Sequence, residues 1–188
     1  PAFRLAPDIQ YVRDGRFVGG PRSGRTTLVR TIAAGIADRT SCADVHVYGL
    51  DGGGGALLPL AGLPHCGAVI PIDAAERADR LLTRLTTEVS RRRALLAHAG
   101  LADVTEQRKR AERGQRLPYL VLLLDGWERI TADLDDIDGG LLTDTLCRLL
   151  REGPSAGLRG VVTADRAGLI GKLPSLASET LLLRLADP

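Results

Sequence analysis

The chain has 188 residues, of which 44% are hydrophobic and 26% charged. These values are typical of one globular domain and exclude a disordered chain. The apolar runs are far shorter than the ~20 residues of a membrane-spanning helix, so we expect no direct membrane insertion by this chain. The net charge of +2 gives no electrostatic argument for a nucleic-acid partner.

Position 1 is proline, and the chain contains no methionine. A whole translation product would begin with methionine, so we expect residues 1–188 to form a single domain of a longer, multi-domain protein. Cys42, Cys66 and Cys147 are scattered and form no C-x-x-C pair. This favours a reducing compartment and argues against a disulfide framework or a zinc site.

Before the first motif, a D-G turn signal predicts a hairpin over residues 11–18. The motif itself is residues 19–27, which fit the phosphate-binding loop G-x-x-x-x-G-K-[ST] at every fixed position except one. Its glycines let the backbone approach phosphate oxygens, and its N–H groups form an anion nest at a helix start. We therefore expect an ATP site, with the Thr26 hydroxyl on Mg²⁺. The expected nucleotide-binding residues are Gly19, Pro21, Arg22, Ser23, Gly24, Arg25, Thr26 and Thr27.

Arg25 replaces the lysine of the motif. Arginine keeps the positive charge and can bind phosphate bidentately, but its planar fork is bulkier than an ammonium group. Phosphate binding is therefore expected, while efficient phosphoryl transfer is in doubt. The alternative is a glycine-proline turn without a ligand. A strand pattern over 16–18 and helical spacing of apolar residues over 28–37 favour the phosphate-binding loop.

The next elements alternate between strand and helix patterns. Residues 45–50 predict a buried strand, followed by Asp51 and four glycines at 52–55. Since the carboxyl ends of parallel strands are where ligands bind, these glycines have two interpretations. We expect tight packing of the loop against its neighbours first, and a contact with a nucleotide or a partner second.

A short strand at 68–70 precedes a long amphipathic helix. Asp73 followed by Glu76 resembles a capping box at the start of this helix. Arg91–Arg93 interrupt its pattern, and we interpret them as a solvated basic face; the alternative is a contact with nucleic acid or with a neighbouring subunit's phosphates. A charged helix is predicted over 104–113.

Residues 118–125 are a run of large aliphatic side chains that ends in an aspartate. This predicts a buried central strand with Asp125 at its tip, where it would hold Mg²⁺ beside Thr26. In active ATPases of this type a glutamate follows the aspartate and polarises the attacking water, but here the position is Gly126. Glu128 is the remaining candidate base, although Trp127–Glu128 more simply opens a loop.

The last third of the chain continues the alternation. We predict an acidic surface loop at 133–138, an amphipathic helix at 141–151, a strand at 160–166 and a final strand at 180–185. The tip of the strand at 160–166 is polar, as a γ-phosphate sensor would be. Strands alternating with helices imply a mostly parallel sheet flanked by helices, with right-handed crossovers.

Three motifs occur in order over nearly the whole chain: 19–26, 50–54 with 63–65, and 122–128. Together they resemble the FtsK/SpoIIIE motor ATPases, and most of all the EccC-type ATPases of actinobacterial type VII secretion. The resemblance implies an α/β, RecA-like P-loop NTPase fold with ATP and Mg²⁺ as cofactors. It also implies a membrane-anchored parent protein whose ATPase domains lie in the cytoplasm.

The departures at Arg25 and Gly126 imply a degenerate later domain of such a protein, with low or no ATP hydrolysis. The resemblance further implies contacts with neighbouring ATPase domains or subunits, in a hexamer or a tandem array. Asp125, Glu128 and Arg166 are the candidate catalytic residues. Arg166 either touches a neighbour's nucleotide or is a plain surface arginine.

Two functions follow from the resemblance. The first is a weakly hydrolysing or regulatory domain of a secretion ATPase, which couples its nucleotide state to the export of a protein substrate. The alternative is a DNA-translocating FtsK/SpoIIIE-type motor domain.

Overall fold

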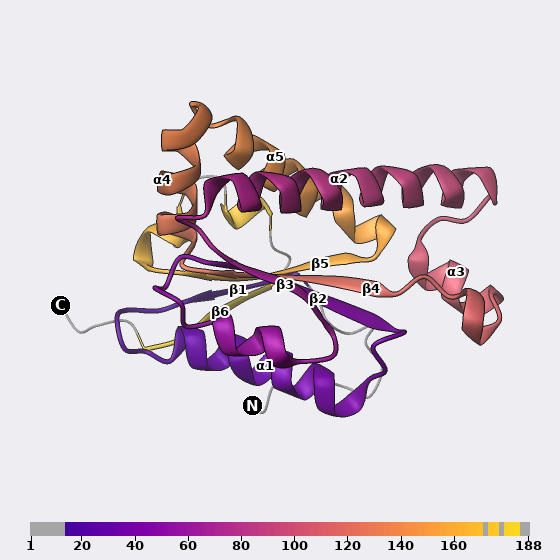
Figure 1. Cartoon of the computed structure of the whole chain (residues 1–188), viewed down its shortest axis with the longest axis horizontal. Coiled ribbons are helices and arrows are strands. Elements are labelled where there is room, and N and C mark those ends of the chain that lie inside the picture. Colours follow the sequence, from indigo (N-terminus) through magenta and orange to yellow (C-terminus); the bar gives the residue numbers. More distant parts are fainter. Residues whose placement is uncertain (1–13, 171–172, 177–178, 185–188) are drawn as a thin grey trace.

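A computed structural model of the chain describes residues 14–170, 173–176 and 179–184. Within them, six strands form one sheet in the order β3-β2-β4-β5-β1-β6, and each neighbouring pair is parallel (Figure 1). The parallel α/β sheet expected from the sequence is therefore confirmed. The strands are β1 (Gly15–Val18), β2 (Val45–Asp51), β3 (Cys66–Pro71), β4 (Tyr119–Asp125), β5 (Leu158–Ala164) and β6 (Glu179–Leu182).

Helices cover both faces of the sheet (Figure 1). Helix α1 lies on one face with the 3-10 turn η2, and α2, α4 and α5 lie on the other. No helix in the described part of the chain is long and apolar enough to span a bilayer. The α-helices are α1 (Arg25–Arg39), α2 (Ala75–His98), α3 (Val104–Arg110), α4 (Trp127–Asp138) and α5 (Leu141–Glu152). The 3-10 turns are η2 (Leu58–Gly62), η3 (Arg113–Gln115), η4 (Gly153–Ala156), η5 (Arg166–Leu169) and η6 (Leu173–Ser175).

Strand β4 is the centre of the core, and all seven of its residues are buried. Successive side chains of a strand point to opposite faces. Leu120, Leu122 and Leu124 accordingly join the core under α2, α4 and α5, whereas Val121 and Leu123 join the core under α1. This explains why the strand reads as an uninterrupted aliphatic run.

The strand order places the functional motifs at one edge of the sheet. Strand β5 lies between β1, which leads into the glycine-rich loop, and β4, which ends at Asp125. On the other side of β4, Asp51 at the end of β2 is in register with Asp125. The carboxyl ends of four neighbouring strands therefore meet beside the loop, where open parallel sheets bind their ligands.

The predictions for residues 127–138 were wrong. Instead of a loop and an acidic surface loop, the segment forms helix α4. Trp127, Ile130 and Leu134 recur at helical spacing and are buried, while the aspartates face outward. Gly139, with φ of 69°, ends the helix in the left-handed conformation that favours glycine.

Two details of α2 and α3 also differ. Helix α2 begins at Ala75 with no side-chain cap, and Asp73 is exposed, so the predicted capping box does not form. Helix α3 ends at Arg110 rather than Arg113.

The solvated basic face expected for Arg91–Arg93 is wrong for the middle residue. Arg92 is buried, and its guanidinium donates to Glu88 Oε1 and to the carbonyl oxygens of Pro118 and Ala156. A buried arginine is tolerated because each of these acceptors compensates its lost hydration.

Two predicted strands shift at their ends: β5 ends at Ala164 and β6 at Leu182. Strand β1 pairs in parallel with β5 and β6. Residues 11–13 of the predicted hairpin lie outside the described residues.

The first glycine after β2 packs tightly, as expected. Gly52 donates its N–H to the Asp125 carbonyl oxygen at 2.8 Å. A β-carbon at this position would lie 2.9 Å from the carbonyl oxygens of both Asp125 and Gly126. Asp51 holds the rest of the loop, since its carboxylate accepts from the N–H groups of Gly53 and Leu57 at 2.8 and 2.6 Å.

This close approach predicts that Gly52→Ala destabilises the domain by about 1–3 kcal/mol, the usual cost of overpacking. Urea unfolding would measure the change. Gly62→Ala is the matched control, because a β-carbon there meets nothing within 4 Å. Equal effects of the two substitutions would contradict the packing at Gly52.

Candidate functional site

The loop at 19–24 has the geometry of an anion nest. A β-carbon on Gly19 would lie 2.4 Å from Ser23 Oγ and 2.9 Å from Leu183 Cβ, so only glycine lets the turn close. Gly24 has φ of 89° and precedes the helix. Arg22, with φ of 60°, is the one non-glycine residue with positive φ in the described part of the chain. Alternating backbone conformations of this kind turn successive N–H groups toward one point.

Helix α1 adds its N-terminus to the nest. The helix begins at Arg25, and its hydrogen-bond ladder starts where Leu28 N–H donates to the Gly24 carbonyl at 2.9 Å. The N–H groups of the first turn have no acceptor within the helix, and the helix dipole is positive at this end. Pro21 and Arg22 of the loop are exposed, as is Thr27 in the first turn of α1. The position suits an anion such as a phosphate group.

The loop and the tip of β4 are joined by a direct contact. Thr26 Oγ1 donates to Asp125 Oδ2 at 2.7 Å, so the two predicted metal-binding residues lie together. The Asp125 side chain is buried, and Thr163 Oγ1 donates to its other oxygen at 2.6 Å. Thr163 in turn accepts from Gly126 N–H at 2.8 Å.

The residues present fit a nucleotide and its metal ion. Ser23 Oγ and Arg25 Nη1 are buried and have no hydrogen-bond partner in the described structure. Buried donors normally have acceptors, and phosphate oxygens would supply them here. The hydroxyl of Thr26 and the carboxylate of Asp125 are the oxygen ligands that Mg²⁺ prefers.

Thr163 is the site residue that the sequence did not single out. The sequence indicated only a polar tip for the predicted strand at 160–166. The role of Thr163 depends on β5 lying between β1 and β4, which is a property of the strand order. The hydroxyl of Thr163 near the end of the strand was the only local signal, and it does not reveal Asp125 as its partner.

Gly126 occupies the position where active ATPases of this type carry a glutamate. Its φ of 86° is in the left-handed region, where it caps the N-terminus of α4. A residue with a side chain would be strained by about 1–2 kcal/mol in this conformation. The backbone itself is therefore shaped for glycine at this point.

Glu128 is engaged with the next strand. Its Oε1 accepts from the N–H of Asp165 at 2.8 Å. Burial raises the pKa of Glu128 above its ordinary value, and the neighbouring Asp165 carboxylate acts in the same direction. The geometry supports a structural link between α4 and the end of β5. A role as catalytic base stays a prediction.

Arg166 is exposed in the turn η5, which directly follows β5. The Asp165 carboxylate caps this turn by accepting from Ala167 N–H at 2.7 Å. The arginine thus stands near the nucleotide edge of the sheet. Both interpretations of Arg166, as a contact with a neighbour and as a surface residue, stay predictions.

The contact between Thr26 and Asp125 predicts a metal-dependent phenotype. Thr26→Val removes one hydroxyl ligand and should weaken nucleotide binding by about 10- to 100-fold when Mg²⁺ is present, the scale of a hydrogen bond to a charged group. Without Mg²⁺ the loss should be small. Titration calorimetry in the two conditions measures both. Thr31→Val is the control, because Thr31 is exposed further along α1 and lies outside the proposed site, and it should bind like the wild type. A loss of binding in Thr26→Val that does not depend on Mg²⁺ would contradict the assignment.

The two roles of Glu128 can be separated. A raised folded-state pKa means that its contribution to stability is lost as pH rises from the ordinary glutamate value through the raised pKa. Glu128→Gln removes this titration and keeps an oxygen that accepts from Asp165 N–H. As pH rises from 4 to 8, we expect the free energy of unfolding of Glu128→Gln to increase relative to that of the wild type. We expect any ATP turnover to be unchanged. If Glu128 were the catalytic base, the same substitution would lower the ATP turnover rate by about 100-fold.

Comparison with known proteins agrees with this geometry. A sequence model of the FtsK/SpoIIIE family matches residues 11–179. The chain is 30% identical over 174 residues to the ESX-4 secretion system protein EccC4 of Mycobacterium tuberculosis. The matched region covers 91% of this chain and 14% of EccC4. It is 25% identical over 150 residues to the type VII secretion system protein EssC of Staphylococcus aureus, and that match covers 80% of this chain and 10% of EssC. The chain thus spans a small part of the relatives it matches.

Solved structures of such proteins share the fold. The structure of Thermomonospora curvata EccC (ATPases 2 and 3) in complex with a signal sequence peptide has a TM-score of 0.81 at 26% identity, with 93% of this chain and 31% of that chain covered. The structure of EssC (ATPases 2 and 3) from Geobacillus thermodenitrificans has a TM-score of 0.82 at 21% identity, with 95% of this chain and 33% of that chain covered. At this identity the similarity shows a shared fold and nothing more. These similarities confirm the RecA-like P-loop NTPase fold. Because the family match takes in most of its length, the chain belongs to the FtsK/SpoIIIE family.

Proposed function

We propose that the chain is one nucleotide-binding domain of a secretion ATPase, which binds ATP with Mg²⁺ and hydrolyses it slowly or not at all. The observation that carries the proposal is the hydrogen bond from Thr26 to Asp125, 2.7 Å long, which joins the loop to the tip of the central strand. The buried, unpaired donors Ser23 Oγ and Arg25 Nη1 support the same site.

The chain's own residues would divide the work in the following way. The N–H groups of the loop and of the first turn of α1 bind the phosphates, and Arg25 adds a cation. Thr26 and Asp125 hold the metal ion, and Thr163 keeps the Asp125 carboxylate oriented. When bound, Mg²⁺ would neutralise charge on the β- and γ-phosphates.

Slow turnover is inferred from the missing base. Gly126 offers no side chain to polarise water, and the backbone there favours glycine. Loss of a general base typically costs about 100-fold or more in rate. Glu128, the first carboxylate after Gly126 in sequence, accepts a hydrogen bond from Asp165 N–H.

The domain is proposed to act with neighbours in a larger, membrane-anchored protein whose ATPase domains lie in the cytoplasm. The chain spans 14% of EccC4, and the similar T. curvata structure contains two ATPase domains and a signal sequence peptide. By analogy, nucleotide state would be coupled to export of a protein substrate. A nucleotide at the open edge of the sheet would be covered by an adjoining domain or subunit, in a tandem array or a hexamer, and the exposed Arg166 lies at that edge.

Titration calorimetry with ATP, with and without Mg²⁺, tests the proposal together with a steady-state ATPase assay. We expect binding at millimolar concentration or tighter, and turnover far below the common enzyme value of roughly 10 s⁻¹. Absence of binding would overturn the nucleotide site, and turnover near 10 s⁻¹ would overturn the regulatory assignment.

The same assays on a polypeptide that includes the flanking domains test the coupling. Joining should change nucleotide affinity or the neighbour's turnover, and Arg25→Ala should alter that change. If nucleotide affinity and turnover are the same for separate and joined domains, and Arg25→Ala changes neither, the loop has a structural role only.

A further inference from the structure

Asp51 and Asp125 are two buried carboxylates that end neighbouring strands. They are in register on β2 and β4, and neighbouring strands of a sheet lie about 4.8 Å apart. The residues just before them, Leu50 and Leu124, belong to the core under α2. Since side chains alternate between the faces of a sheet, both carboxylates point to the opposite face, which α1 covers and where Thr26 lies. Two negative charges therefore lie side by side in the proposed nucleotide site.

Hydrogen bonds satisfy the oxygens of this pair without cancelling its charge. Asp51 accepts from two backbone N–H groups, and Asp125 accepts from the hydroxyl groups of Thr26 and Thr163. In the part of the chain that the structure describes, no arginine or lysine forms an ion pair with either aspartate. Two like charges this close repel, and the low dielectric of the interior strengthens the repulsion. A pair of this kind attracts a cation.

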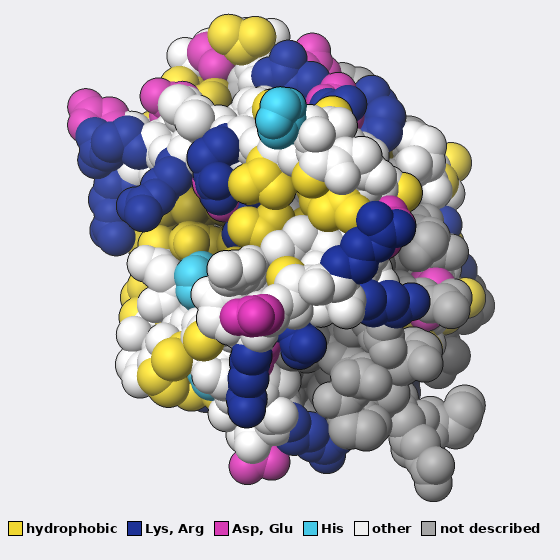
Figure 2. Space-filling view, turned by 90° about the vertical axis from the view of Figure 1, so that its right-hand side faces the viewer, with side chains coloured by type: hydrophobic (Ala, Val, Ile, Leu, Met, Phe, Trp, Pro, Cys, Tyr) yellow, Lys and Arg dark blue, Asp and Glu magenta, His cyan; other side chains and the backbone are white. Residues whose placement is uncertain are grey.

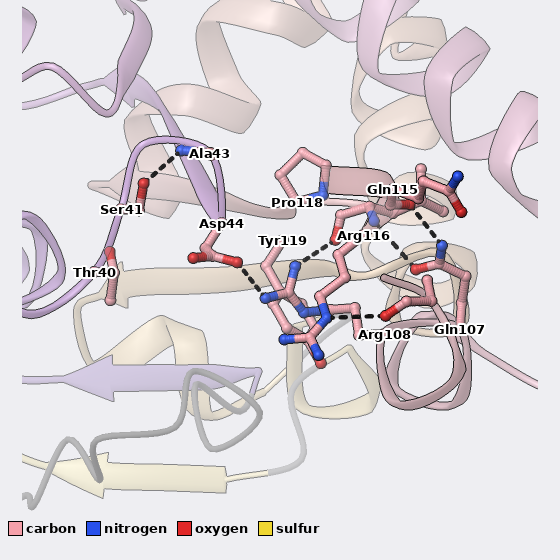
Figure 3. Close-up of polar contacts among 12 residues, drawn as sticks. Thr40, Ser41, Ala43, Asp44, Gln107, Arg108, Gln115, Arg116, Pro118 and Tyr119 are labelled. Atoms are coloured by element: carbon pink, nitrogen blue, oxygen red, sulfur yellow. Dashed lines mark hydrogen bonds and ion pairs between the residues drawn. The ribbon is translucent and has the colours of Figure 1, made fainter. Parts of the chain in front are cut away.

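Carboxylates at the other end of the sheet have cationic partners within the chain. Asp44, just before β2, forms an ion pair with Arg108 (Figure 3). Glu88 on α2 accepts from Arg91 and Arg92. Figure 2, which faces the amino ends of the strands, shows arginine and lysine side chains around this face with acidic ones among them. The chain thus supplies arginines to its partly buried carboxylates at this end and leaves the pair at the carboxyl ends to a cation from outside.

Gly53 leaves a cradle between the two carboxylates. A β-carbon built on it would lie 3.1 Å from Asp125 Oδ2 and 3.4 Å from Asp51 Oδ1. The same Oδ2 atom accepts the hydroxyl of Thr26. The cradle is thus bounded by one oxygen of each aspartate, beside the contact that joins the loop to β4. Asp51 also lines a hollow of about 340 Å³ at this edge of the sheet, which gives water a route to the pair.

We propose that Asp51 is a further residue of the metal site, whose carboxylate balances the charge of Mg²⁺ and accepts a hydrogen bond from the hydration shell of the ion. This rests on the proposed function, in which Thr26 and Asp125 hold the ion. Mg²⁺ in proteins keeps several of its waters, and a water in the cradle would have an oxygen of each aspartate as a partner. Groups around the direct ligands of a metal ion contribute to its affinity. Asp51 thus has two tasks, to hold the glycine loop and to bind the ion through water.

Two substitutions test the charge and the cradle separately. Asp51→Asn removes the charge and keeps one oxygen acceptor. Gly53→Ala fills the cradle with a methyl group, and the backbone tolerates it because Gly53 is not among the described glycines with positive φ. Titration calorimetry measures ATP affinity without Mg²⁺ and at several Mg²⁺ concentrations. In each variant the gain in ATP affinity on adding Mg²⁺ should fall by about tenfold or more, the scale of a lost partner around a metal ion. ATP affinity without Mg²⁺ should not fall, because the loop at 19–24 binds the phosphates.

Asp73→Asn is the matched control. Asp73 is exposed and lines the same hollow as Asp51, but it does not border the cradle. Its substitution removes the same charge, and the gain from Mg²⁺ should equal that of the wild type because solvent screens an exposed charge. An equal fall in Asp51→Asn and Asp73→Asn would identify a long-range effect of charge and overturn the role of Asp51.

Two further results would overturn this role. One is a wild-type gain from Mg²⁺ in Asp51→Asn. The other is a loss of ATP affinity that is equal with and without Mg²⁺, which would leave Asp51 only its task in the loop. Thr26→Val keeps this proposal apart from that of the nucleotide site. If the wild type gains nothing from Mg²⁺, the metal site itself is wrong; if Thr26→Val loses the gain and Asp51→Asn keeps it, only the role of Asp51 is wrong.

Discussion

The hydrogen bond between the Thr26 hydroxyl and the Asp125 carboxylate joins residues that are 99 positions apart, and the carboxyl edge of the sheet is built around it. Asp125 is buried, and an ionised carboxylate out of water must find donors or it destabilises the fold. Its neighbour in register, Asp51, has the same requirement. Hydroxyl and N–H groups meet both requirements, and their geometry fixes the loop, the tip of β5 and the glycines after β2. A site that satisfies its own carboxylates in this way is already shaped to receive a metal ion and phosphates.

Much of this arrangement was predictable, because the deciding signals are local. The glycine spacing around Thr26 and the aliphatic run before Asp125 each indicate one element and its end. The helix at 127–138 was missed because its many aspartates masked an apolar period of only three buried side chains. The burial of Arg92 and the role of Thr163 could not be predicted, since their partners come from distant segments that only the strand order brings together.

Strand β4 ends at Asp125 in the proposed nucleotide site, and every one of its residues is buried. A rigid, fully packed strand is a poor hinge, so a change at this site would reach the rest of the domain by movement of whole elements rather than by bending of the sheet. This is in keeping with slow turnover and with a role among neighbouring domains.

The central claim is that the loop and Asp125 together form a nucleotide site. A crystal structure of the chain with Mg²⁺ and a non-hydrolysable ATP analogue tests it most directly. The account predicts the β- and γ-phosphates against the N–H groups of 19–26, Arg25 and Ser23 bonded to phosphate oxygens, and the metal ion beside Thr26 and Asp125. An analogue bound elsewhere, or a loop whose buried Ser23 and Arg25 donors stay without partners while the analogue is present, would contradict it.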